Sequence, residues 1–337
     1  MFRVRRSAPD GAAHVRQIRS SIRRPQKPPT LEEFAPKFLE GYAKADRHKP
    51  SGVASKETIL RIHLVPVLGS QKLDAITNAQ VQRLKLHLTD KAAKTVNNVL
   101  TVLSVMLKTA IEWEMIDQLP CSIRLLPVAR RDAAFHDFGA YERLLNAALS
   151  IDSRTYLIAL LGGEGGMRAG EIVALEWDDV DLERRQISIR HSDWRGQLTS
   201  PKSGRGRFVA MTERVATALR KQRHLRSPRV LCLDDGKPIT RQGAWSRVRY
   251  AAHRANVPTG VHILRHTFCS HLVMRGAAMR SVQELVGHQD LTMTQRYSHL
   301  SPAALIDTVR LLESRVAESG RGEILETAEG RDRKLKS

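Results

Sequence analysis

Apolar side chains recur every three or four residues along most of the chain, and this spacing predicts a mainly α-helical protein. The longest run predicts a helix over residues 93–113, whose apolar stripe comprises Val96, Val99, Leu100, Leu103, Met106, Leu107 and Ala110. Shorter helices are predicted over about residues 55–65 and 77–89. Another helix is predicted to begin at Thr30, because Thr30 can cap it and Glu33 follows at the matching position.

The hydrophobic pattern changes once, in "RRQISIRHSDWRGQLTSPKSGRGRFVAM", where strand-like alternation replaces the helical period. Ile187 and Ile189 alternate with polar residues in the first predicted strand, and Phe208, Val209 and Met211 mark the second. The segment "PKSGRG" supplies a turn between them, so the two strands are expected to pair in an antiparallel sheet. Helical patterning then resumes to about residue 319.

Polar and proline-rich stretches divide the chain into parts. "QLPCSIRLLPVARRDAAFHDF" holds two prolines and a basic pair, which is typical of an exposed connection between domains. It separates an all-helical domain, residues 30–128, from a mostly helical domain with a small antiparallel sheet, residues 132–318. Residues 1–29 form a basic arm that ends in a proline-stiffened linker, and residues 319–337 form a polar tail.

The chain is strongly basic, since 55 Lys and Arg against 35 Asp and Glu give a formal net charge of +20. A large polyanion is therefore the expected partner, and nucleic acid fits best. An anionic membrane surface is the alternative, but no uniformly apolar stretch reaches the roughly 20 residues that a membrane helix needs. The basic N-terminus is not followed by the apolar run of a signal peptide.

The cysteines, Cys121, Cys232 and Cys269, lie far apart and form no C-x-x-C pair. This spacing indicates neither a disulfide framework nor a cysteine zinc site, so we expect a reduced, cytoplasmic protein.

Candidate reactive side chains are scattered, and each has an ordinary structural interpretation. In "GGEGGMRAGEIVALEW", Arg168 precedes a helix and Glu171 follows three residues later, as in many surface ion pairs. The glycines lack the G-K-[ST] that completes a phosphate-binding loop. Lys202, in the predicted turn between strands, is by default a solvated lysine, although a flexible basic turn can reach into a neighbouring groove.

The segment "VHILRHTFCSHL" is the richest in such residues. His262 and Arg265 are one helical turn apart, so both can face one site. His266 lies four residues after His262, which raises the possibility of a metal site, but no glutamate stands at the H-E-x-x-H position. We expect His266 instead to pack or to cap the helix together with Phe268 and Leu272.

The segment "ELVGHQDLTMTQRYSHL" predicts a helix that ends at Gly287, with His288 directly beyond it and Tyr297 in a short helix. Singly, His288 is more typical of a structural residue and Tyr297 of a core residue. Together, two arginines, a lysine, two histidines and a tyrosine form a complete set for attacking a phosphodiester without a metal. The tyrosine would attack, the arginines and one histidine would bind the nonbridging oxygens, and the lysine would protonate the leaving oxygen.

This ordered set resembles that of the tyrosine recombinases of the phage-integrase family, over roughly residues 30–318. By this resemblance the catalytic residues are Arg168, Lys202, His262, Arg265, His288 and Tyr297, with Glu171 in support. Ile263 stands where the family commonly has Asp, which is not a catalytic position. The resemblance implies a site-specific recombinase or integrase that cleaves and rejoins DNA through a covalent 3′-phosphotyrosine, without metal or cofactor.

The same resemblance implies that a SAM-like core-binding domain and the catalytic domain close around double-stranded DNA as a clamp. The implied DNA contacts are Lys94, Thr95, Asn97, Arg241, Arg247 and Arg249, and we expect the first three to contact phosphates rather than to recognise bases. A solvated helix face is an equally good interpretation of the last three. Further implied partners are copies of this chain in a tetramer, docked through "SPAALIDTVRLLESR", and accessory directionality or DNA-bending proteins, in the cytoplasm at the nucleoid.

Two other functions are compatible with parts of this pattern. A type IB topoisomerase uses a similar residue set, but the separate helical domain and the "LVGHxxLxxTxxYxH" arrangement favour a recombinase. A DNA-binding protein that has lost catalysis is the alternative from outside the enzymes, and the intact residue set argues against it.

Overall fold

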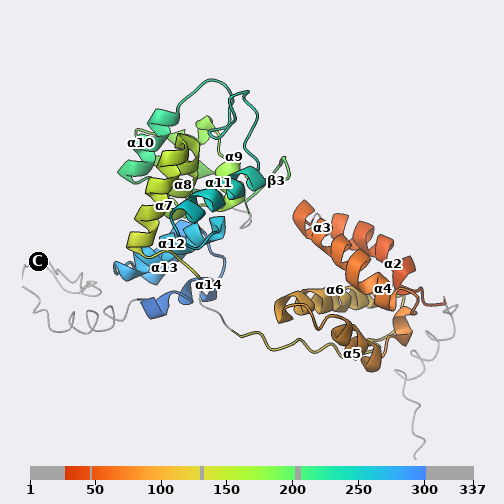
Figure 1. The fold of residues 1–337 in the computed structure, drawn as a ribbon. Coiled ribbons are helices and arrows are strands. Elements are labelled where there is room, and N and C mark those ends of the chain that lie inside the picture. The colour runs from red at the N-terminus through yellow and green to blue at the C-terminus, as the bar shows by residue number, and fades with distance from the viewer. Residues whose placement is uncertain (1–26, 46–47, 130–132, 202–205, 301–337) are drawn as a thin grey trace, which may run out of the picture. The chain divides into compact units, whose positions relative to one another are not determined.

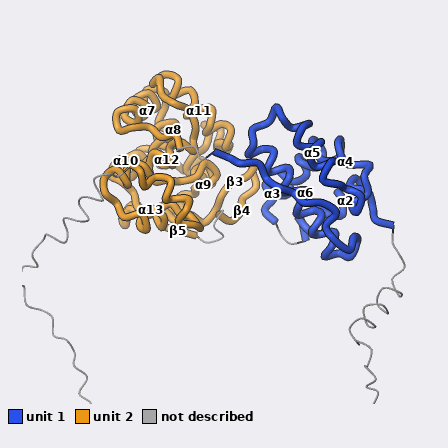
Figure 2. The backbone as a smooth tube through the Cα atoms, turned by 90° about the horizontal axis from the view of Figure 1, so that it is seen from below, with its two compact units in different colours: residues 1–131 blue, residues 132–337 orange. Residues whose placement is uncertain are grey.

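The computed structural model describes residues 27–45, 48–129, 133–201 and 206–300. The chain divides into two compact units, residues 1–131 and 132–337 (Figure 2). Nearly all of the predicted basic arm, the polar tail and the segment "SPAALIDTVRLLESR" lie outside the described residues, as does Lys202.

Unit 1 is a set of helices (Figure 1). They pack around an apolar core of their own. Its elements are α2 (Leu31–Phe38), η1 (Leu39–Lys44), α3 (Pro50–Ile59), η2 (Leu60–Leu64), α4 (Val65–Leu68), η3 (Leu73–Ala75), α5 (Asn78–His87) and α6 (Ala93–Glu112). Thr30 and Glu33 exchange the predicted capping hydrogen bonds at the start of α2. The predicted apolar stripe of α6 is buried. Every named element in the described part of unit 1 is helical, as the sequence predicted.

The helix predicted over residues 55–65 is longer in the structure, where a continuous helical run extends from Pro50 to Leu68 through α3, η2 and α4. None of the residues of α3 is buried. An exposed helix shows no apolar periodicity, so its first turns left no hydrophobic signal. Pro50 occupies the first helical turn, where a missing N–H costs nothing.

Unit 2 is mostly helical and packs around α8. Its helical elements are α7 (Phe138–Ile151), α8 (Ser153–Gly163), α9 (Ala169–Ala174), η4 (Trp177–Asp179), α10 (Glu213–Gln222), α11 (Arg241–Arg254), α12 (Val261–Met274), α13 (Met279–Val286), α14 (Thr292–Gln295) and η5 (Ser298–Leu300). Helix α8 is buried on every side from Leu157 to Gly163 and contacts α7, α10, α11 and α12. A Cβ on Gly162 would lie 2.8 Å from that of Leu264, so this glycine brings α12 close to α8.

A small antiparallel sheet accompanies these helices. Strands β1 (Val180–Asp181), β2 (Gln186–Ile189) and β5 (Arg207–Ala210) pair in the order β1-β2-β5, and Ile187 lies opposite Val209. The predicted pairing of the two main strands is therefore confirmed.

The simple turn predicted between those strands is wrong, because a second hairpin intervenes: β3 (Ser192–Trp194) and β4 (Gln197–Thr199). Its two-residue turn is Arg195–Gly196, and both residues have positive φ, 51° and 81°. This turn type usually carries Asn or Asp before the glycine. Arginine at that position, together with strands of only three residues, explains why the sequence pattern missed it.

Within the described ranges, the structure has no helix that is both long and apolar enough to cross a membrane.

Helix α13 ends as predicted at Gly287, whose φ of 65° and ψ of 50° are left-handed. The backbone N–H of His288 donates to the Gln283 carbonyl, 3.1 Å away, which closes the helix end and directs the chain away from the helix axis.

We predict that Gly287→Ala lowers the free energy of unfolding more than Gly276→Ala does. Both glycines have left-handed φ, 65° and 82°, so both variants acquire a strain of about 1 kcal/mol. Only the new methyl at residue 287 meets a neighbour, Cδ of Arg207 at 3.0 Å, while nothing lies within 4 Å at residue 276. Urea denaturation of the full chain measures the difference, expected at about 1 kcal/mol. Equal losses would contradict this contact.

Candidate active site

A buried carboxylate organises the candidate site. Arg168 is the N-cap residue of α9, and its backbone N–H donates to Oε2 of Glu171 at 2.9 Å. The Nη1 group of Arg168 donates to Oε1 of the same carboxylate, also at 2.9 Å. Only 1% of Glu171 is exposed. Burial alone would raise the pKa of Glu171, but the hydrogen bonds and charges of Arg207 and Arg168 outweigh it and lower the pKa to about 2.

Arg207 is a member of this cluster that the sequence analysis missed. It opens β5 and binds Glu171 through both ends of its guanidinium, with Nη1–Oε1 at 2.9 Å and Nη2–Oε2 at 2.7 Å. The run "GRGRFVAM" contains two arginines, Arg205 and Arg207, and residue type alone did not distinguish them. Its position at the start of the second predicted strand was the available signal.

Arg265 lies on α12 and is 5% exposed. Its Nη1 and Nη2 groups donate to the carbonyls of Gly166 and Val286, each at 2.6 Å. Burial, together with the neighbouring charges of Arg168 and Arg207, lowers the pKa of Arg265 to about 9. The guanidinium therefore stays charged at neutral pH, and its desolvation strengthens its attraction for an anion.

His288 follows Gly287 and lies beside the arginines. Burial and the charges of Arg265 and Arg168 lower the pKa of His288 to about 3, so its imidazole is neutral at physiological pH. Its Nδ1 lies 2.9 Å from the hydroxyl oxygen of Thr294. When Thr294 donates this hydrogen bond, the imidazole proton resides on Nε2 and can be donated to an anion. Thr294 is fully buried, and its part in orienting His288 was not foreseen.

Tyr297 lies between α14 and η5 and is only 2% exposed. It packs against Cys269, Val273, Val282 and Val286 in a small apolar cluster. Its hydroxyl is hydrogen-bonded to Nδ1 of His266. Burial, with the neighbouring Cys269, raises the pKa of Tyr297 above its usual value. The side chain therefore both packs a core and offers a protonated hydroxyl to a specific partner.

His266 does more than the packing or capping that the sequence indicated, because its Nδ1 is hydrogen-bonded to the Tyr297 hydroxyl. Burial and the nearby charge of Arg296 lower the pKa of His266 to about 4. A neutral imidazole has one ring nitrogen without a proton, and only that nitrogen can accept from the hydroxyl.

His262 is exposed near the start of α12. It lines a hollow together with Trp194 and Arg195 of the β3–β4 hairpin and Arg241 at the start of α11. The structure thus brings Arg168, Glu171, Arg265 and His288 together. The Tyr297 hydroxyl is hydrogen-bonded to His266, and His262 lines the hollow. Among the described residues, no group of three or more His, Cys, Asp or Glu side chains could hold a metal ion.

The residues predicted to contact DNA differ in their surroundings. Lys94 and Thr95 are exposed at the start of α6. The side-chain amide of Asn97 is hydrogen-bonded to the backbone of Leu126. It donates to the Leu126 carbonyl at 2.9 Å and accepts from the Leu126 N–H at 2.8 Å. This amide joins the start of α6 to the segment that follows unit 1's helices.

In unit 2, Arg241 is exposed, whereas Arg247 forms an ion pair with Asp152, the residue that caps α8. The guanidinium of Arg249 lies 4.6 Å from the ring centroid of Trp245. Arg247 and Arg249 therefore have structural partners within the unit, and Arg241 is the arginine of this helix that lines the hollow with His262.

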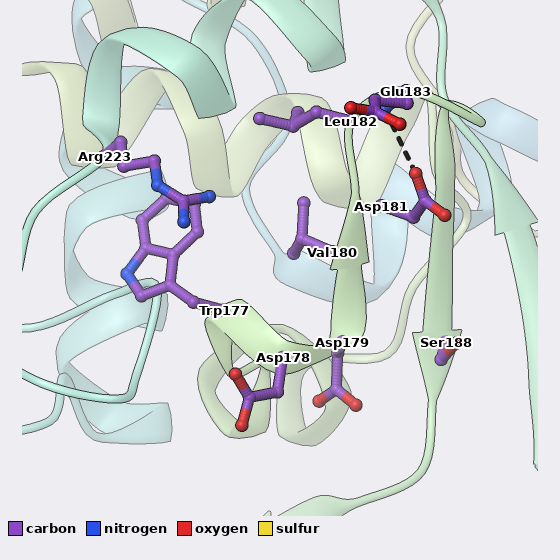
Figure 3. A pocket seen from close by; sticks show the side chains of 9 residues that line it. All are labelled: Trp177, Asp178, Asp179, Val180, Asp181, Leu182, Glu183, Ser188 and Arg223. Carbon is purple, nitrogen blue, oxygen red and sulfur yellow. Dashed lines mark hydrogen bonds between the residues drawn. The ribbon is translucent and has the colours of Figure 1, made fainter.

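A second hollow has the opposite character (Figure 3). Its lining includes the carboxylates of Asp178, Asp179, Asp181 and Glu183, with the Arg223 guanidinium 5.4 Å from the Trp177 ring centroid. Clustered carboxylates repel a phosphate backbone. The hollow that holds His262 and Arg241 is therefore the better candidate for contact with DNA.

Two family models match the chain. The model described as the phage integrase family matches residues 136–304, and the model described as the phage integrase N-terminal SAM-like domain matches residues 30–88. The first covers every described residue of the arginine, histidine and tyrosine set, and the second covers the helices α2 to α5.

Curated relatives include tyrosine recombinases XerD. The protein from Bifidobacterium longum is 34% identical over 149 residues, which covers 42% of this chain and 48% of the relative. The protein from Mycobacterium leprae is 31% identical over 190 residues, covering 48% of this chain and 60% of the relative. The matches thus span about half the length of these relatives.

Solved structures share the fold at low sequence identity. The Tn1549 transposon integrase in complex with circular intermediate DNA has a TM-score of 0.73 and 22% identity, covering 84% of this chain and 99% of that one. A lambda integrase tetramer bound to a Holliday junction has a TM-score of 0.65 and 15% identity, covering 85% and 84%. From the two family models and this shared fold, we conclude that the chain belongs to the phage integrase family.

Proposed function

We propose that this protein is a site-specific DNA recombinase or integrase that cleaves and rejoins DNA through a covalent 3′-phosphotyrosine at Tyr297. The observation that carries the proposal is the convergence of Arg168, Arg265 and neutral His288 at the end of α13, one short segment before Tyr297. Such a set of desolvated donors is suited to the nonbridging oxygens of a phosphate as charge grows on them.

In the proposed step the Tyr297 oxygen attacks the phosphorus, and the bond from phosphorus to the 5′ oxygen breaks. The 5′ oxygen takes a proton, for which we propose Lys202 as the acid, and His262 assists proton transfer. The phosphodiester energy is kept in the tyrosine–DNA bond, so a second 5′ hydroxyl can reverse the step on another strand without a nucleotide cofactor. Because the hydroxyl is hydrogen-bonded to Nδ1 of His266, whose imidazole is neutral, His266 is placed to take the tyrosine proton as the oxygen attacks.

The proposed partner is a double-stranded recombination site. The exposed Lys94, Thr95 and Arg241 are suited to contact phosphates, whereas Asn97 and Arg247 are occupied within their own units. We also propose a tetramer on DNA, as the lambda integrase of similar fold forms on a Holliday junction. Cytoplasmic action at the nucleoid, carriage by a mobile element and accessory directionality proteins belong to the same proposal.

We predict that Tyr297→Phe abolishes the covalent protein–DNA adduct while DNA affinity stays within about twofold, because only the hydroxyl is lost. The substrate is a nicked duplex that carries the DNA flanking the gene, and a denaturing gel detects the adduct. Tyr250→Phe is the matched control, since Tyr250 is 56% exposed on α11 of the same unit. An adduct that persists in Tyr297→Phe, or no adduct from the wild type, would contradict the proposal.

We predict that the free energy of unfolding falls as the pH decreases from 6.5 to 5. The pKa values of His266 and His288 are depressed in the folded state, to about 4 and about 3, so the unfolded state binds more protons in this range. Their contribution is complete above the unfolded pKa near 6.5 and is lost as the pH falls toward the folded values.

His266→Asn tests this prediction, because asparagine keeps a polar group near Nδ1 but does not titrate. Its stability should depend less steeply on pH than that of the wild type, by on the order of 0.5 kcal/mol per pH unit after discounting for partial exposure. The exposed His253 of α11 supplies the control variant, His253→Asn. Equal slopes in His266→Asn and the wild type would contradict the depressed pKa.

A further inference from the structure

Three arginines donate to three consecutive backbone carbonyls at the end of α13. Arg207 Nε donates to Leu285 at 3.3 Å, Arg265 Nη2 to Val286 at 2.6 Å, and Arg168 Nη2 to Gly287 at 3.1 Å. The last carbonyls of a helix have no partner within the helix and carry partial negative charge. These three carbonyls therefore hold the guanidinium groups in place. His288 follows Gly287 directly in the chain.

Arg207 differs from the other two in how its nitrogens are used. Both Nη groups are bound to the Glu171 carboxylate, and Nε is bound to Leu285. Its side chain is 9% exposed, half the 18% of Arg168. Each of the three guanidinium nitrogens of Arg207 thus donates to the protein, whereas no hydrogen bond from Nε to another described residue is seen for Arg168 or Arg265, so Arg207 is the most firmly held of the three.

The groups that Arg207 binds are those that place the phosphate-binding residues. Glu171 receives both the backbone N–H and the Nη1 group of Arg168, so fixing this carboxylate fixes that guanidinium. Leu285 lies three residues before His288, and the Arg207 side chain also lies against Gly287. One side chain thus connects β5, the N-terminus of α9 and the C-terminus of α13.

We propose that Arg207 is a positioning residue for DNA cleavage, which orients Arg168 through Glu171 and His288 through the end of α13. This inference rests on the proposed recombinase function. It requires arginine specifically, because the planar fork spans both carboxylate oxygens while Nε remains available for Leu285. A lysine keeps the positive charge beside Glu171 but supplies a single point of attachment.

The competing explanation is a buried ion pair that only stabilises the fold, and unit 2 offers a matched control. Arg229 is 8% exposed, lies 3.3 Å from the Glu176 carboxylate through Nε, and donates to the Val173 carbonyl at 3.1 Å. It is thus also a buried arginine that joins a glutamate to a helix carbonyl, but it binds none of the proposed catalytic residues.

The test compares Arg207→Lys, Arg229→Lys and Arg168→Ala with the wild type in the full chain. DNA affinity and the single-turnover rate of adduct formation are measured on the nicked duplex with the flanking DNA. Once wild-type cleavage has located the scissile phosphate, the same rates are measured on a duplex with a neutral methylphosphonate there. Replacing one charged oxygen by methyl reduces the charge that Arg168 must offset.

We expect Arg207→Lys to cleave the phosphodiester at least 10-fold more slowly with DNA affinity within about twofold, a loss of about 1.4 kcal/mol or more in transition-state stabilisation. On the methylphosphonate, the cleavage rates of Arg207→Lys and Arg168→Ala should come closer to the wild-type rate. Arg229→Lys should cleave both substrates at the wild-type rate.

Wild-type rates from Arg207→Lys would overturn the inference and leave the proposed function intact. An equal deficit on both substrates, or a deficit shared by Arg229→Lys, would assign Arg207 a structural role only. Absence of an adduct from the wild type would instead overturn the proposed function itself.

Discussion

The buried Glu171 carboxylate is the interaction on which the candidate site depends. Bringing Arg168, Arg207 and Arg265 together in a desolvated region would be unfavourable without a compensating negative charge, because like charges repel most strongly where water is excluded. Glu171 supplies a full charge, and the carbonyls at the end of α13 supply partial ones. Burying an isolated carboxylate would cost several kcal/mol, but here it is held by hydrogen bonds from two guanidinium groups.

This arrangement leaves a net positive site whose shape is set before any phosphate binds. Arg265 is fixed by two carbonyls, and burial together with the charges of the neighbouring arginines lowers the pKa of His288 and keeps it neutral. Donors that are already oriented need little reorganisation when charge develops on a phosphate, which is how preorganised sites lower reaction barriers. The structural elements that hold the donors, α9, β5 and α13, come from distant parts of the sequence.

The proposed nucleophile, Tyr297, is held differently from the groups proposed to bind the phosphate. Tyr297 lies in an apolar cluster, and its hydroxyl is hydrogen-bonded to Nδ1 of His266. Burial raises the pKa of Tyr297. The proton must be removed when the oxygen attacks, so burial in this arrangement disfavours the reactive form. In the proposed cycle Tyr297 therefore passes through two successive states, one in which it packs in the core and one in which it attacks DNA.

Much of the fold could be predicted from the sequence, because the information is local. The stripe of α6, the cap at Thr30 and the glycine end of α13 follow from periodicity and from backbone preferences. The exposed α3 and the β3–β4 hairpin lacked such signals. The parts played by Arg207, Thr294 and His266 could not be predicted, since they depend on which side chains tertiary packing brings together.

The central claim, that these groups make Tyr297 the nucleophile, is tested most directly by mapping the covalent attachment. The protein–DNA adduct formed on the nicked duplex would be digested with a protease and a nuclease, and the modified peptide sequenced by mass spectrometry. The account predicts a nucleotide joined through its 3′ phosphate to Tyr297. Attachment to any other residue, or through a 5′ phosphate, would contradict it.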